Sequence, residues 1–269
     1  MKVRTVAAAQ GNSVVDPRQL HSPRFVRYFT RYTRRYVGRN FHAVRVSRDG
    51  LPELPPDRPV IVYANHPSWW DPLIVLLLTD RFFAGRSAYG PMNSETLKKY
   101  GFMRRLGVFG VRQNWLWSGA QFLKIGENLL RDPAALLVVT AQGRLIDPRE
   151  RPVLLMPGIA YLARRVPAAI LLPLALEYPF WDERYPEALA RFGAPVLGHD
   201  RTPARLLPLL QRHLEEAMDV LARDALSRDP SRFLPVLEGS VGVGGVYDVW
   251  RRARAGLLGQ SFRPGHGDR

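Results

Sequence analysis

Short apolar runs alternate with amphipathic stretches along most of this chain. Continuous apolar runs, typical of strands buried on both faces of a sheet, occur at 60–64, 135–139 and 170–176. Apolar positions spaced three and four residues apart predict helices over 71–79, 118–131, 158–165 and 203–226. Shorter segments predict strands at 41–46, 82–84 and 108–111, and a basic helix over 93–105. Strands alternating with helices predict an α/β fold with a mixed, largely parallel sheet flanked by helices.

The N-terminal part of the chain predicts an amphipathic helix over residues 22–40. Ser22-Pro23 matches a helix cap followed by proline at the first helical position. Aromatic residues then recur on one face, at Phe25, Phe29, Tyr32 and Tyr36. Arginines flank this face, and no acidic residue occurs between Ser22 and Val46. The pattern is typical of a helix lying in a membrane interface. The alternative is an ordinary surface helix whose aromatic side chains pack into the core.

Changes in composition divide the chain into four parts. Residues 1–21 are polar and aperiodic and are expected to form a mobile tail, followed by the interfacial helix at 22–40. Residues 41–236 form the predicted catalytic domain, and 237–269 a Gly-rich turn with a basic C-terminal helix and tail. No apolar run approaches the roughly 18–20 residues that a spanning helix needs. We therefore expect a cytoplasmic protein that is peripheral on the inner face of the membrane.

Composition limits the chemistry that the protein can perform. The chain lacks cysteine, which excludes disulfides, thiolate catalysis and cysteine-based zinc sites. Its net charge of +15 favours phosphate-bearing partners, although an arginine-rich background from a GC-rich genome would raise the total as well. No recognisable nucleic-acid module is present, so we expect an anionic membrane surface and no nucleic acid as partner.

The candidate chemistry begins where the first buried strand ends. His66 and Asp71 follow that strand and have four residues between them. A histidine titrates near neutral pH and suits a general base, and a carboxylate on its other ring nitrogen would orient it. Such a pair is common by chance, and a histidine is more often structural than catalytic. No ligand spacing for a metal is evident, so metal-assisted hydrolysis is the least favoured interpretation.

Three later segments strengthen the catalytic interpretation. A short strand leads to Arg112 in Gly107-Val108-Phe109-Gly110-Val111-Arg112, and a buried strand ends near Arg144 in Gln142-Gly143-Arg144. A third segment, 166–176, passes from helix to strand through prolines. Guanidinium groups bind phosphates through paired hydrogen bonds, so Arg112 and Arg144 are candidate anion ligands. Arg149 and Arg151 lie close to Arg144 in sequence and compete for that role.

In this order and spacing, the four segments resemble the motifs of the glycerophospholipid acyltransferase family, typified by 1-acylglycerol-3-phosphate acyltransferase. The family's His-x4-Asp motif matches residues 66–71, its Gly-x-Phe-x-x-Arg motif matches 107–112, and the similarity covers about 22–200. The resemblance implies that His66 and Asp71 are catalytic. It also implies acyl-CoA or acyl-carrier protein as co-substrate, a lipid acceptor, and no other cofactor. The residues that it implies for substrate binding are Gly107, Phe109, Arg112, Gln142, Gly143 and Arg144.

The third motif departs from the family pattern. The family usually has Phe-Pro-Glu-Gly-Thr-Arg, whereas residues 140–145 read Thr-Ala-Gln-Gly-Arg-Leu. Gln142 forms hydrogen bonds but carries no charge, so the usual acceptor is in doubt. The acceptor is either a lysophospholipid-like hydroxyl or a non-phosphate lipid or glycolipid, for example a carotenoid glycoside. A non-catalytic binder of anionic lipid is the alternative from a different class.

Two further features near His66 have open interpretations. Trp69 and Trp70 either line an acyl channel or belong to the core. Acyl transfer also needs donors for the developing oxyanion. Backbone N–H groups at the helix start after His66, or near Gly143, are candidates for this role.

Overall fold

The strand before His66 forms the centre of the sheet. β2 (Val60–Ala64) is buried along its whole length, so other elements must cover both of its faces. It pairs in parallel with β5 (Ala135–Thr140) on one side and with β6 (Ile170–Glu177) on the other. The computed structural model describes residues 15–111, 118–198 and 201–240.

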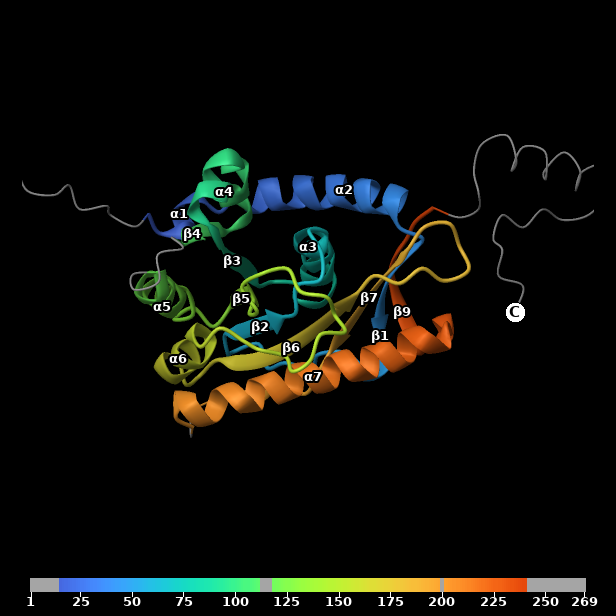
Figure 1. The fold of residues 1–269 in the computed structure, drawn as a ribbon. Helices are drawn as coiled ribbons and strands as arrows, with labels where there is room; N and C mark the ends of the chain where they lie inside the picture. The colour runs from blue at the N-terminus through green and yellow to red at the C-terminus, as the bar shows by residue number, and fades with distance from the viewer. Residues whose placement is uncertain (1–14, 112–117, 199–200, 241–269) are drawn as a thin grey trace, which may run out of the picture.

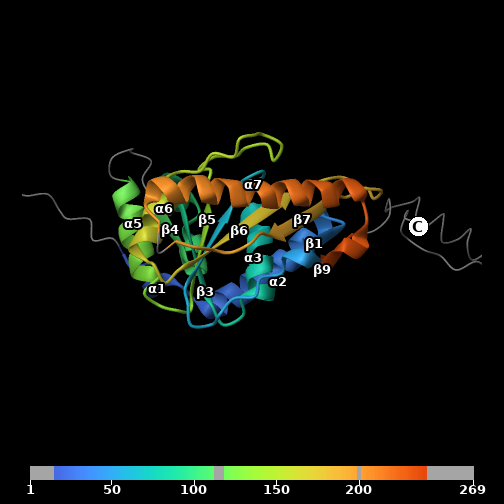
Figure 2. The same ribbon diagram turned by 90° about the horizontal axis from the view of Figure 1, so that it is seen from below.

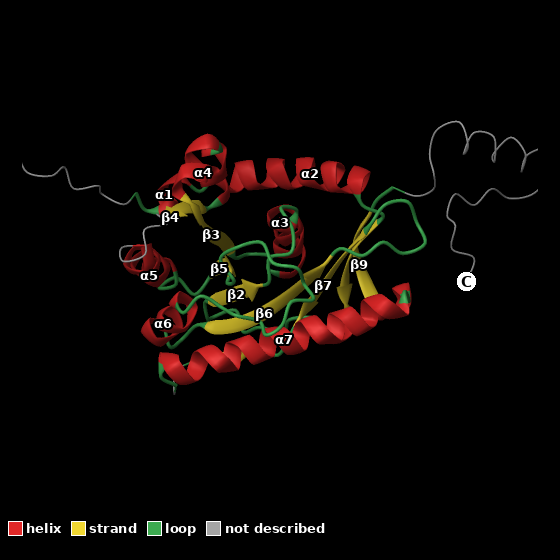
Figure 3. Ribbon diagram, viewed as in Figure 1, coloured by secondary structure: helices red, strands yellow, loops and turns green. Residues whose placement is uncertain are grey.

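Within these residues the sheet has nine strands and is mostly parallel. Figure 3 shows its strands in yellow between red helices. The other strands are β1 (Ala43–Ser47), β3 (Ser87–Asn93), β4 (Val108–Val111), β7 (Glu187–Phe192), β8 (Val196–Leu197) and β9 (Phe233–Glu238). The order across the sheet is β4-β3-β5-β2-β6-β7-β1-β9, with β8 paired to β6. Antiparallel pairs join β6 to β7 and β8, and β1 to β9. The predicted α/β fold with a mixed, largely parallel sheet is confirmed.

Helices cover both faces of the sheet (Figure 1). One face carries α2 (Pro23–Asn40) and α3 (Asp71–Phe82), and the other carries α5 (Ser118–Leu129), α6 (Gly158–Arg165) and α7 (Pro203–Ser227). Figure 2 shows α7 running along the length of the sheet. Alternate residues of β2 point to opposite cores, Val60 and Val62 toward α2 and α3, and Ile61 and Tyr63 toward α6 and α7.

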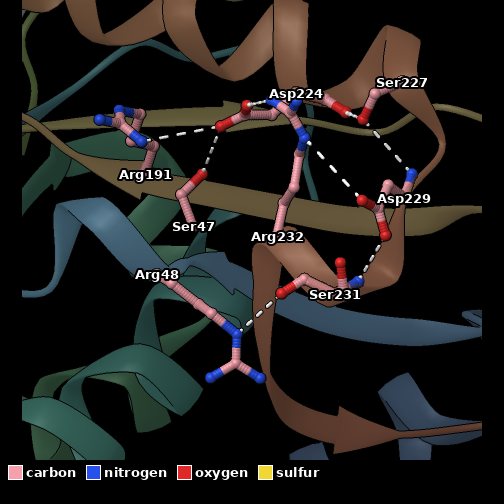
Figure 4. Close-up of polar contacts among 8 residues, drawn as sticks. All are labelled: Ser47, Arg48, Arg191, Asp224, Ser227, Asp229, Ser231 and Arg232. Atoms are coloured by element: carbon pink, nitrogen blue, oxygen red, sulfur yellow. Dashed lines mark hydrogen bonds and ion pairs between the residues drawn. The ribbon is translucent and has the colours of Figure 1, made fainter.

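An ion-pair cluster fixes the C-terminal end of α7 to the sheet (Figure 4). Asp224 of α7 accepts a hydrogen bond from Ser47 at the end of β1 and lies 3.7 Å from Arg191 of β7. Arg232, in the short turn before β9, donates to the same carboxylate at 2.9 Å. The Asp224 carboxylate therefore joins β1, β7 and α7. It is far from His66 in the sequence.

Three predicted elements differ from the structure. Residues 82–84, predicted as a strand, are the end of α3 and the following loop. The predicted helix over 93–105 is α4 (Ser94–Lys99), capped by the side chain of Asn93, followed by the 3-10 helix η2 (Gly101–Leu106). The predicted tail already has structure at its end, where Pro17–Leu20 forms the short helix α1 and Asp16 caps it. Residues 1–14 and 241–269, which contain the rest of that tail and most of the Gly-rich C-terminal part, lie outside the described residues.

Candidate functional site

The motif segments meet at one edge of the sheet. β2, β4 and β5 are parallel to one another through the pairings that also include β3, so their carboxyl ends share an edge. After β2 the chain enters α3 on one face of the sheet, and after the neighbouring β5 it enters α6 on the other face. In open α/β sheets, ligands bind at the carboxyl edge where adjacent connections diverge in this way. His66 and Gln142 follow the two diverging strands.

His66 and Asp71 form a hydrogen-bonded pair. The distance from His66 Nδ1 to Asp71 Oδ2 is 2.6 Å, and the backbone N–H of Ser68 donates to the same oxygen at 3.3 Å. The Asp71 side chain is 1% exposed and that of His66 is 22% exposed. Asp71 is the first residue of α3, where the helix dipole favours a negative charge. A proton on Nδ1 faces the carboxylate, which leaves Nε2 as the ring nitrogen that can accept a proton.

A tyrosine that the sequence reasoning missed completes the polar contacts of Asp71. The hydroxyl of Tyr178, which directly follows β6, donates to Asp71 Oδ1 at 2.6 Å. Burial raises the pKa of Tyr178 well above its usual value, and the charge of Asp71 and the hydrogen bond to it act in the same direction. Tyr178 therefore stays protonated and donates. No local pattern marks it, because its partner lies 107 positions earlier in the chain.

Asn65 fixes the end of β2 to the end of β6. Its fully buried side chain donates from Nδ2 to the carbonyl of Leu176 at 2.9 Å and accepts from the N–H of Leu176 at 2.8 Å. The side chain continues the β2–β6 ladder by one step, which sets His66 and Tyr178 at fixed positions relative to each other.

The turn after β5 is held against His66 through its backbone. Gln142 is buried, and its Oε1 accepts from the N–H of His66 at 3.2 Å. The N–H of Ile146 donates to the His66 carbonyl at 2.9 Å. Between them Gly143 has a φ of 75°, in the left-handed region that suits glycine. Gln142 thus contacts the backbone of the loop that contains His66.

The predicted anion ligands have different surroundings. Arg144 is 71% exposed in its side chain and lies 3.6 Å from the carboxylate of Glu150. Such an exposed pair is weak and leaves the guanidinium available. Of its competitors, Arg151 pairs with Asp219 and is 27% exposed in its side chain. Arg149 pairs with Asp147 but is 88% exposed, so it is as available as Arg144. Arg112 lies outside the described residues.

Gly107 and Phe109 have structural positions. Gly107 has a φ of 91°, and a Cβ there would lie 2.2 Å from the carbonyl oxygen of Ala88. Phe109 is 5% exposed and belongs to the core on the α6 and α7 side. Glycine therefore permits a tight turn beside β3, and the phenylalanine anchors β4. Contact of these two residues with substrate stays a prediction.

Trp69 and Trp70, predicted either to line an acyl channel or to belong to the core, have different surroundings. The Trp70 ring packs edge-on against Phe41, with centroids 4.9 Å apart, on the core side. Trp69 stacks on Trp70 at 4.3 Å and is 59% exposed. An acyl channel is not defined by these contacts, but Trp69 gives an exposed apolar side chain three positions after His66.

Ring contacts extend from Trp69 into a continuous surface, here termed the aromatic strip. Successive ring centroids lie 4.3–6.4 Å apart from the tryptophans along α2 to η2. Its members are Trp69, Trp70, Tyr36, Tyr32, Phe29, Tyr28, Phe25 and Phe102. The buried face of α2 consists instead of Thr30, Thr33 and Val37. The aromatic face of this helix is therefore only partly covered: Tyr28 and Tyr32 are exposed, whereas Phe25, Phe29 and Tyr36 are half-buried.

Most of the backbone N–H groups suggested as oxyanion donors already form hydrogen bonds within the protein. The N–H of Gly143 donates to Thr140, and that of Asp71 to the carbonyl of Ser68. The N–H groups of Ser68 and Trp70 bond side chains within the loop. The amide nitrogen of Gln142, in contrast, has no acceptor among the hydrogen bonds of the described residues. It is therefore a neutral donor without a partner there, in the turn beside His66.

Two pockets lie beside α7 and not at His66. Their volumes are about 260 and 280 Å³. The first is lined by Pro148, Arg149, Arg151, Glu177, Asp219 and Ala222. In the described part of the chain, no group of three or more metal-ligating side chains is arranged to hold an ion. In the same residues, no helix has the length and apolar character to cross a membrane.

Comparison with known proteins adds no assignment: no protein-family model matches the chain, and no characterised protein matches its sequence.

Proposed function

We propose that the protein is a membrane-surface O-acyltransferase that moves a fatty acyl group from acyl-CoA or acyl-carrier protein to a lipid hydroxyl. The observation that carries the proposal is the His66–Asp71 pair, with its 2.6 Å contact, at the carboxyl edge of the sheet where adjacent connections diverge. An oriented imidazole with one free nitrogen is the arrangement that general base catalysis requires.

In the proposed reaction, Nε2 of His66 takes the proton of the acceptor hydroxyl. The hydroxyl oxygen attacks the thioester carbonyl carbon and forms the new C–O bond, and the C–S bond breaks. The departing thiolate takes the proton from His66 and leaves as the thiol. Asp71 holds Nδ1 and stabilises the imidazolium, as the aspartate does in a serine-protease triad. The substrate oxygen occupies the place of the serine, so no covalent enzyme intermediate is needed.

The acceptor that we favour is a lysophospholipid-like hydroxyl. The exposed guanidinium of Arg144 near the site is suited to a phosphate group. The neutral Gln142, where the resembling family has a carboxylate, favours as second candidate an acceptor without phosphate, such as a glycolipid. Both candidates use the same base and differ in the headgroup.

The aromatic strip supports a membrane surface as the place of reaction. Exposed arginines accompany it on α2, and an acidic side chain is absent from that helix. Arg105 lies over the ring of Phe25 at 4.3 Å, which places a cation at the strip itself. Aromatic rings with flanking cations suit the headgroup region of an anionic bilayer. The strip ends at Trp69, so the lipid surface and the base would be adjacent.

Transfer assays with labelled acyl donors and a panel of lysolipid and glycolipid acceptors test the proposal. We expect His66→Ala and Asp71→Asn to lower the transfer rate by at least about a thousandfold, by analogy with triad aspartate and histidine replacements. Asp80→Asn is a matched control, since it lies on the same helix α3 in an exposed pair with Arg34 and should keep its activity. Wild-type rates in the two site variants would exclude this mechanism.

A non-catalytic binder of anionic lipid is the alternative from a different class. It predicts vesicle binding that weakens strongly with salt and that is unchanged in His66→Ala. Absence of transfer with every donor and acceptor, together with such binding, would favour this alternative.

A further inference from the structure

Asp71 is a buried carboxylate with contacts to both of its oxygens. His66 and the Ser68 N–H bond Oδ2, and Tyr178 bonds Oδ1. The residues in contact with Asp71 thus include one titratable base and one titratable donor. A hydrogen bond to a charged oxygen at 2.6 Å is short and strong, so the two partners compete for the same negative charge.

We propose that Tyr178 is a positioning residue that sets the basicity of His66 by withdrawing charge from Asp71. The inference rests on the proposed function and extends it to a residue outside the motif segments. The phenol donates to one carboxylate oxygen and thereby lowers the charge that the other oxygen presents to the imidazole. A weaker carboxylate stabilises the imidazolium less, so the base stays neutral to lower pH.

The surroundings of Tyr178 fit this role. The ring packs against Phe41, with centroids 5.8 Å apart, and that phenylalanine also contacts Trp70 of the catalytic loop. Asn65 bonds the backbone of Leu176, two residues before Tyr178, and directly precedes His66. His66 and Tyr178 are therefore both held by the pair of strands β2 and β6. Because the phenol stays protonated, the direction of the hydrogen bond does not change across the working pH range.

Two substitutions change the donor in opposite directions. Tyr178→Phe removes the hydroxyl and keeps the ring, whereas replacement of Tyr178 by 3-fluorotyrosine gives a more acidic, stronger donor. On the acidic limb of the pH–rate profile, we expect Tyr178→Phe to lower kcat by roughly ten- to a hundredfold, the range for one hydrogen bond to a charged group, because more of His66 is then protonated. KM should change little. The acidic limb of its pH–rate profile should move to higher pH, because the unshared carboxylate stabilises the imidazolium more. The fluorotyrosine protein should move that limb to lower pH.

Tyr63→Phe is the matched control. Tyr63 is fully buried on β2, and its hydroxyl has no hydrogen-bond partner. Loss of this hydroxyl should leave the pH–rate profile where it is. If both Tyr178 proteins keep the wild-type acidic limb, Tyr178 only supports the fold and the inference is wrong. Should Tyr178→Phe fail to fold, the fluorotyrosine protein retains every contact and decides the question.

A measurement without substrate separates this inference from the proposed function. In the protein with ¹⁵N-labelled histidine, NMR follows the ring of His66, assigned by the signal that His66→Ala lacks. A titration midpoint that rises in Tyr178→Phe supports the inference even if no acyl transfer is found, in which case the proposed function alone fails. Acyl transfer with an unshifted midpoint overturns the inference and leaves the proposed function in place.

Discussion

Three of the four polar atoms of His66 form hydrogen bonds, and the fourth, Nε2, forms none among the described residues. Nδ1 meets Asp71, the N–H meets Gln142, and the carbonyl meets Ile146. The ring and the backbone are therefore held by separate elements, β2 with α3 on one side and the turn after β5 on the other. This arrangement leaves Nε2 as the polar atom of His66 without a hydrogen bond in the described part of the chain, and it gives Gln142 a role independent of any charge.

The amide of Gln142 predicts a specific response to its replacement by glutamate. Oε1 accepts from the His66 N–H, which directs the amide nitrogen away as a free donor. Gln142→Glu keeps the acceptor, removes the donor and adds a negative charge beside the backbone of His66. We expect kcat/KM to fall by at least about tenfold, the lower limit for a hydrogen bond to a charged group. Gln211→Glu on α7 is the control for the same chemical change. A fully active Gln142→Glu protein would show that the amide nitrogen does not contact substrate.

At the scale of single residues, the sequence predicted contacts between residues that are close in the chain or that directly follow a strand. The base and its carboxylate are five positions apart, so their spacing is visible in the chain. Tyr178 and the bridging role of Asn65 depend on β2 and β6 being neighbours, which no spacing in the sequence reveals. A motif names Gly107 and Phe109 as substrate residues, and the structure adds packing roles for both that the motif does not indicate.

At the scale of elements, the prediction was best where a segment determines its own structure. Apolar runs and helical periodicity gave β2, β5, β6 and α6 within a residue or two. The strands that were missed depend on their partners. β3 contains glycine and proline and is held by β4 and β5, while β7 has the composition of a helix former. β9 contains Pro235 opposite a register shift at the edge of the sheet, where a missing N–H costs little.

The hydrogen bonds of Asn65, which join the end of β2 to the end of β6 at the β2–β6 junction, predict that replacing this residue lowers the stability strongly. Asn65→Ala removes two hydrogen bonds and leaves the buried N–H and carbonyl of Leu176 without partners. We expect the free energy of unfolding to fall by roughly 2–4 kcal/mol, because each buried polar group left unsatisfied costs about 1–3 kcal/mol. Asn40→Ala, which removes one partly exposed bond to Tyr36, should cost no more than about 1 kcal/mol. Urea denaturation of both variants measures the difference, and equal losses would contradict a special role for the junction.

For the whole molecule, the two faces of the sheet carry different surfaces. α2 presents the aromatic strip with exposed arginines, and the strip leads to the loop that contains His66. The opposite face is covered by α7, whose exposed side chains are of both signs. The distribution of charge between the two faces is therefore more informative about membrane binding than the net charge of +15. A molecule that meets a bilayer with its α2 face would place the base near the lipid surface.

This orientation predicts that charge loss weakens vesicle binding on one face only. Arg27 and Arg31 are exposed on α2, and each cation near an anionic surface contributes about 1 kcal/mol. Arg27→Gln combined with Arg31→Gln should lower the partition coefficient on phosphatidylserine vesicles roughly thirtyfold at low salt. The pair Arg205→Gln and Arg223→Gln on α7 makes the same change in net charge on the opposite face and should have little effect. Sedimentation with vesicles compares the two double variants directly. Equal losses would mean that net charge drives binding, and the aromatic strip would then have no part in orienting the molecule.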